Sequence, residues 1–149
     1  MRLYKMSKIF IIFFTCCVLN STVCFAAYET HHLSVQMGIA ADVLDFFYKS
    51  SASDSQFEWL SRNFSYDLKH KLTKSQFGAL RLIVRDEYGF LKDSKFYIFQ
   101  RFDQVDRVGY IGTFTKDKVA KIIFTFDKEN RLTDFAFTPV KQPEVKAAK

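Results

Sequence analysis

Cysteine is scarce in this chain of 149 residues, and all three copies lie near the N terminus, at Cys16, Cys17 and Cys24. The segment around them has the order of a cleavable secretory signal, with a cationic start, an apolar run over Ile9–Leu19 and small residues at its end. We therefore expect a signal peptide over residues 1–26. After cleavage the chain keeps no thiol for a disulfide, a thiolate metal site or a cysteine nucleophile.

Long hydrophobic runs are also absent. The run over Ile9–Leu19 is far shorter than the roughly 20 residues that cross a hydrocarbon core, which favours a cleaved signal over a membrane anchor. A lipoprotein signal is disfavoured too, because Ser21, Thr22 and Val23 before Cys24 do not form a lipobox. We expect an exported protein, periplasmic or secreted, with no stable membrane insertion after cleavage.

The expected mature chain lacks a strong excess of positive charge. The whole chain has a formal net charge of +6, but the signal removes Arg2, Lys5 and Lys8 and no acid. A tail over 141–149, predicted to be disordered, is also basic. The domain between these ends, predicted over 33–140, is therefore close to neutral, and we expect it not to bind nucleic acid.

Helical periodicity dominates the first half of this domain, after a flexible leader expected over 27–32. Apolar residues recurring every three or four positions predict three helices, over 33–48, 57–72 with a bend, and 73–88. Thr73 and Gln76 form a capping box at the start of the third helix. Gly89 supplies the positive φ that is favoured at its end.

After Asp93 the hydrophobic period changes from 3.6 to 2, which predicts strands. The alternating segments lie over 96–103, 108–114, 119–127 and 132–139. Their short polar connections predict antiparallel neighbours, and Asn130 suits a hairpin position with positive φ. Leu132 falls on the opposite parity from Phe135 and Phe137, so a bulge is expected in the last strand.

Three stretches of the chain resemble small secreted domains of the nuclear-transport-factor-two-like, cystatin-like superfamily: Leu72–Phe77, Tyr88–Lys92 and Ile123–Asp127. The resemblance implies an α+β fold, with three N-terminal helices packed on a curved four-stranded antiparallel sheet around a cone. Relatives use the cone for small ligands, for catalysis or for dimer contacts. The chain departs from many relatives at Glu129-Asn130, where they carry Asp-Gly.

The face of the sheet that points away from the helices is the candidate binding surface. If Phe96, Ile98 and Phe102 point at the helices, strand alternation turns their neighbours outward. The predicted binding residues on this face are Tyr97, Phe99, Arg101, Ile111 and Ile123, and Tyr110 is added to them as a core ring whose hydroxyl is expected at the rim. Aromatic, aliphatic and arginine side chains together are typical of interface cores, so we expect a protein partner or self-association as a homodimer.

Catalytic motifs are missing from the mature sequence. No serine–histidine–aspartate arrangement, phosphate-binding glycine loop or metal-ligand spacing is present, and His31 with His32 falls short of a ligand set. We therefore assign no catalytic residue, metal or cofactor. The sequence favours a non-enzymatic exported binding or accessory domain that uses its sheet face or holds a small apolar ligand in the cone. The alternative is a cofactor-free isomerase, dehydratase or hydrolase with an acid–base residue inside the cone, such as Tyr97, Arg101, Asp103 or Tyr110.

Overall fold

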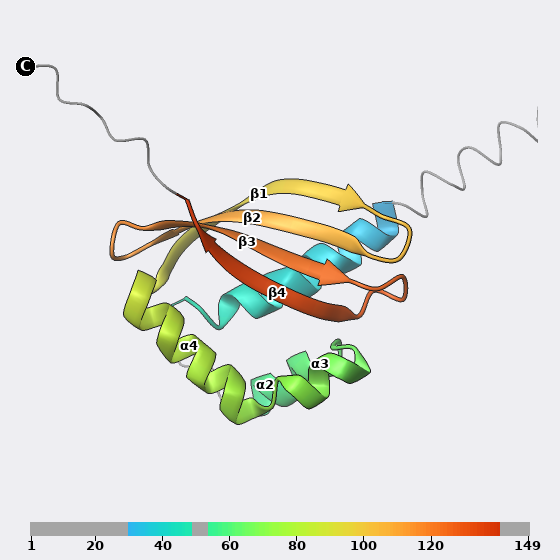
Figure 1. Cartoon of the computed structure of the whole chain (residues 1–149), viewed down its shortest axis with the longest axis horizontal. Coiled ribbons are helices and arrows are strands. Elements are labelled where there is room, and N and C mark those ends of the chain that lie inside the picture. The colour runs from blue at the N-terminus through green and yellow to red at the C-terminus, as the bar shows by residue number, and fades with distance from the viewer. Residues whose placement is uncertain (1–29, 49–53, 141–149) are drawn as a thin grey trace, which may run out of the picture. The chain divides into compact units, whose positions relative to one another are not determined.

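The computed structural model describes residues 30–48 and 54–140 (Figure 1). The chain divides after Ser34, and residues from Val35 onward belong to a unit of their own. In that unit helices pack with a four-stranded antiparallel sheet, which confirms the predicted α+β class. The predicted signal peptide, most of the leader and the tail over 141–149 lie outside the described residues.

The described helices comprise a first helix over 30–45, α2 (Asp54–Ser61), α3 (Tyr66–Lys71) and α4 (Lys74–Tyr88). The first helix thus includes residues 30–32, which the sequence assigned to the leader. Residues 66–71 form a separate helix, although the sequence predicts them to continue the preceding one. The reason is that Phe64 leaves the helix to pair with Leu132 as a parallel bridge, and the Ser65 hydroxyl then caps α3.

Both ends of α4 match the sequence prediction. Thr73 Oγ1 accepts from the backbone N–H of Gln76 at 3.4 Å, and Gln76 Oε1 accepts from the N–H of Thr73 at 2.8 Å, which completes the capping box. At the other end Gly89 has a φ of 88°. A Cβ on residue 89 would collide with Thr115 Oγ1, which accepts from the N–H of Phe90 at 2.9 Å. Only glycine fits this junction between α4 and the sheet.

The sheet has the order β1 (Leu91–Arg101), β2 (Asp106–Phe114), β3 (Val119–Phe126) and β4 (Leu132–Pro139). The two central strands pair without a register shift, whereas each edge strand contains extra residues. In β4 the extra residue is Thr133, so the predicted bulge of the last strand is confirmed. In β1 the extra residues are Lys92 and Tyr97, which the sequence did not predict.

Phenylalanine rings fill the space between the helices and the sheet. The ring centres of Phe135 in β4 and Phe77 in α4 lie 6.3 Å apart. Those of Phe137 and Phe47, which comes just after the first helix, lie 4.8 Å apart. Phe124 stacks against Phe135 and is fully buried. This sheet face, which packs on the helices, is called the inner face below. The Thr133 bulge is what allows Leu132, Phe135 and Phe137 to share it.

Substituting Gly89 with alanine is expected to lower the free energy of unfolding by at least about 2 kcal/mol, because a side chain is strained at this φ and collides with Thr115. Urea denaturation of the purified protein measures the change. Gly38→Ala is the matched control: this helical glycine has open space around it, so alanine should stabilise by roughly 0.5–1 kcal/mol. Equal effects of the two substitutions would contradict the assignment.

Candidate functional site

An apolar row crosses the sheet on the outer face, the face opposite the helices. Directly paired residues of neighbouring strands project to the same face, and the pairing aligns Ile98, Gly109, Ile123 and Ala136 across β1 to β4. Gly109 has no side chain, and the side chains of Ile98 and Ile123 occupy the space above it. A Cβ on residue 109 would lie only 2.8 Å from atoms of both isoleucines. The two isoleucines therefore form a continuous strip instead of separate contacts.

Polar and basic residues flank this apolar row. One neighbouring row consists of Lys95, Ile111, Lys121 and Thr138, and the other of Gln100, Arg107, Thr125 and Asp134. Tyr97, at the bulge of β1, is 54% exposed, and Lys121 Nζ lies 5.3 Å from the centre of its ring. The outer face thus combines a narrow aliphatic centre, an exposed tyrosine and a basic rim.

The structure divides the six predicted binding residues between the two faces. Ile111 and Ile123 lie on the outer face, as predicted, and so does Tyr97 through its contact with Lys121. The outward placement of Phe99 and Arg101 was wrong. The extra residue at the Tyr97 bulge reverses the parity, so that Phe99 pairs with the buried Val108, Arg101 pairs with the buried Asp106, and Ile98 turns outward.

Tyr110, the sixth predicted residue, belongs to the inner face, as expected of a core ring. Its ring centre lies 6.1 Å from that of Phe96 and 6.0 Å from that of Phe124, and only 7% of the residue is exposed. Burial raises the pKa of its hydroxyl. Asp103, a candidate of the enzymatic alternative, is exposed between β1 and β2. The structure therefore does not bring Tyr97, Asp103 and Tyr110 together on one wall.

A buried polar cluster at the start of β2 was missed by the sequence reasoning. Asp106 is fully buried, and its Oδ1 accepts from Lys128 Nζ at 2.7 Å while Oδ2 accepts from Gln36 Nε2 at 3.0 Å. Gln36 Nε2 also donates to Asn130 Oδ1 at 2.9 Å, and Arg101 Nε lies 3.7 Å from Asp106 Oδ1. The cluster joins the first helix, β1, β2 and the β3–β4 turn.

Sequence signals for this cluster do exist. Asp106 has the same parity as Val108 and Tyr110, which places it on the inner face if the strand is extended back through the polar connection. Gln36 falls between the apolar positions Leu33 and Ala40 of the first helix. A polar residue in each of two facing apolar stripes is the pattern expected of a buried hydrogen-bonded pair.

The charge state of Asp106 follows from its partners. Burial by itself raises the pKa of the carboxyl, but the hydrogen bonds from Lys128 and Gln36 and the charges of Lys128 and Arg101 outweigh it, so the pKa is lowered. Asp106 is therefore an ionised anchor with low affinity for a proton. Gln36 Oε1 is buried and accepts no hydrogen bond from the described residues.

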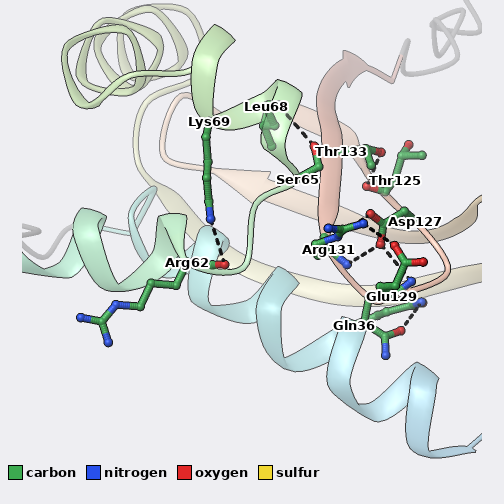
Figure 2. Close-up of polar contacts among 11 residues, drawn as sticks. Gln36, Arg62, Ser65, Leu68, Lys69, Thr125, Asp127, Glu129, Arg131 and Thr133 are labelled. Carbon is green, nitrogen blue, oxygen red and sulfur yellow. Dashed lines mark hydrogen bonds and ion pairs between the residues drawn. The ribbon is translucent and has the colours of Figure 1, made fainter.

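The turn between β3 and β4 positions two members of the cluster. Figure 2 shows Gln36 of the first helix beside this turn. Asp127 Oδ1 accepts from the N–H groups of Glu129 and Arg131 at 3.0 and 2.8 Å, and Arg131 Nε donates to Asp127 Oδ2 at 2.8 Å. Asn130 has a φ of 62°, as predicted for this hairpin. The folded turn thereby directs Lys128 and Asn130 toward Asp106 and Gln36.

Comparisons of the chain with protein-family models, with curated proteins and with solved structures found no match. Within residues 30–48 and 54–140, no helix has both the length and the apolar character needed to cross a membrane. In the same described ranges, no histidine, cysteine, aspartate and glutamate side chains form a group able to hold a metal ion.

Replacing Asp106 with asparagine is expected to destabilise the protein by about 1–3 kcal/mol at pH 7, because Lys128 loses its charge partner and the buried Gln36 its carboxylate acceptor. Since the pKa of Asp106 is lower in the folded chain, its contribution is present above the unfolded-state pKa and is lost as pH falls through the folded-state pKa. The difference between the two proteins should therefore shrink on acidification.

Thermal unfolding between pH 7 and pH 3 measures this dependence. Asp134→Asn provides a control, because Asp134 is an exposed carboxylate on the outer face. The control should follow the native protein over the whole range. A constant difference between native protein and Asp106→Asn down to the lowest pH would refute the ionised-anchor role.

Proposed function

We propose that the protein is an exported, non-enzymatic binding domain that docks a protein partner on the outer face of its sheet. The observation that carries this proposal is the apolar row through Ile98 and Ile123, flanked by the exposed Tyr97 and a basic rim. Among residues 30–48 and 54–140, the ring contacts that join the sheet to the helical layer belong to the inner face. This arrangement supports the outer face as the side on which a partner would bind.

The composition of the outer face suits a protein surface. An aliphatic centre within a polar rim is the usual anatomy of an interface, and tyrosine is enriched in such centres because it combines a large apolar ring with a polar tip. The rim contains Lys95, Lys121 and Arg107 together with Asp134. Charges of both signs at fixed positions can select a partner and its orientation more than they add affinity.

A cystatin-like cone, in which the sheet curls around the helices, is part of this proposal. Its support is the distribution of extra residues: Lys92, Tyr97 and Thr133 lengthen the two edge strands, while the central pair stays in register. A bulge bends its strand and increases the local twist, so bulges at both edges favour a curved sheet. The phenylalanine rings fill its inner side, which favours contact with a partner through the outer side.

The enzymatic alternative finds less support in the geometry. A general base inside the cone needs a carboxyl whose pKa is raised toward neutrality. Asp106, the one carboxyl that is fully buried among the described residues, has instead a lowered pKa and is bonded to Lys128 and Gln36. This pairing accounts for the buried carboxylate by its contribution to stability, so no catalytic role is needed to explain it.

The test compares charge insertions on two exposed aromatic residues of similar exposure. Tyr97→Asp places an acid on the outer face, and Trp59→Asp places one on α2, away from the sheet. Tagged protein is used for affinity capture from the source cell envelope, and sedimentation velocity measures self-association. We expect Tyr97→Asp, but not Trp59→Asp, to weaken capture of the partner or dimerisation at least about tenfold.

A second variant, Ile111→Asp, should reproduce the effect of Tyr97→Asp, because both residues lie on the outer face. Unchanged melting temperatures establish that the variants remain folded. The proposal fails if both outer-face variants bind and associate like the native protein, or if the α2 variant alone loses binding.

A further inference from the structure

A groove lies between the turn that ends the first helix, α4 and the beginning of the sheet, and it encloses about 120 Å³. Its apolar walls include Phe46, Phe47 and Phe90. Its polar lining includes two arginines of α4, Arg81 and Arg85, which are one helical turn apart. Such a concave site, mostly apolar with a few convergent charged groups, has the character of a ligand site.

Contacts with Phe46 hold Arg81 in place, and no carboxylate within the described ranges neutralises it. Its Nε donates to the backbone oxygen of Phe46 at 2.8 Å, and its guanidinium lies 5.7 Å from the centre of the Phe46 ring. A guanidinium has five N–H donors, so this bond leaves the terminal nitrogens of Arg81 for another acceptor. Burial and the like charge of Arg85 lower the pKa of Arg81, which is the effect of a cation placed beside a second cation.

Arg85 has a similar arrangement on the other side of the groove. Its guanidinium lies 5.2 Å from the centre of the Phe90 ring, and within the described residues no carboxylate pairs with it or with Arg81. Stacking on an aromatic ring orients a guanidinium without using its hydrogen-bond donors. Two oriented cations therefore line one small apolar groove without a counter-charge from the described part of the chain.

We propose that this groove binds a small organic carboxylate with an aromatic or branched aliphatic body. The carboxylate would receive charge-assisted hydrogen bonds from Arg81 and Arg85, whose planar forks match its two oxygens. The apolar body would pack against Phe46, Phe47 and Phe90. The volume is below the roughly 300–1,000 Å³ of sites for drug-sized ligands, which favours a ligand about as large as phenylacetate.

This inference is independent of the binding proposed for the outer face. The groove is made by α4 and the end of the first helix, whereas the outer face consists of strand residues such as Tyr97 and Ile123. A variant of one surface leaves the residues of the other unchanged, so the two can be tested separately.

The experiment titrates the purified protein with phenylacetate by calorimetry and by ¹H–¹⁵N NMR. Phenylacetamide, which has the same shape without the charge, acetate, which lacks the apolar body, and inorganic phosphate serve as comparison ligands. We expect phenylacetate to bind most tightly and to shift the amides of α4, Gly89 and Phe90. Each comparison ligand should bind at least about tenfold more weakly, since each lacks one of the two recognised features.

Arg85→Gln is the main variant, because the Arg85 guanidinium makes no hydrogen bond that supports the fold among the described residues. It should weaken phenylacetate binding about 10- to 100-fold with an unchanged melting temperature. Arg81→Lys, which keeps the charge and removes the fork, should also weaken it. Lys118→Gln is the control: Lys118 Nζ lies 5.4 Å from the ring centre of Tyr88, a cation–π pair outside the groove lining, and its loss should leave phenylacetate binding unchanged.

Equal binding of phenylacetate and phenylacetamide would overturn the proposal, as would tighter binding of phosphate. Phenylacetate binding that Arg85→Gln leaves unchanged, or that shifts amides outside the groove only, would overturn it as well. The proposal would also be overturned if phenylacetate showed no measurable binding at millimolar concentration.

Discussion

Asp106 imposes a constraint on the whole domain, because a carboxylate without solvent contact must be compensated by its neighbours. The neighbours that do so, Gln36, Lys128 and Arg101, come from the first helix, the β3–β4 turn and β1. None of these elements can shift without uncovering a charge. Phe46, which borders the groove, follows Gln36 by ten positions and lies in the turn after the first helix, so the buried cluster and the groove involve different parts of this segment.

Local rules predicted much of the fold from the sequence. The capping box at Thr73, the positive φ of Gly89 and Asn130, and the bulge in the last strand are each set by a few neighbouring residues, and the structure contains all of them. They were predictable because each depends on backbone stereochemistry or on the parity of adjacent side chains. The strand order followed in the same way from connections too short for anything but antiparallel neighbours.

Features that depend on partners far along the chain were not predictable in this way. Aromatic or aliphatic residues occupy every position from Phe96 to Phe99, so either parity buries rings, and nothing local reveals the extra residue at Tyr97. That bulge turns Ile98 outward and Phe99 and Arg101 inward. Asp106 was assigned to a polar connection because its compensation by Gln36, seventy positions away, becomes visible only after folding.

The bulges of β1 also affect the edge that this strand forms in the described part of the sheet. An exposed edge strand offers unpaired N–H and C=O groups to which another strand can add, and bulges and lysines are common means of preventing such addition. In β1 the extra residues Lys92 and Tyr97 interrupt the regular ladder, and Lys95 lies between them. This edge is therefore a poor template for amyloid-like stacking or strand exchange.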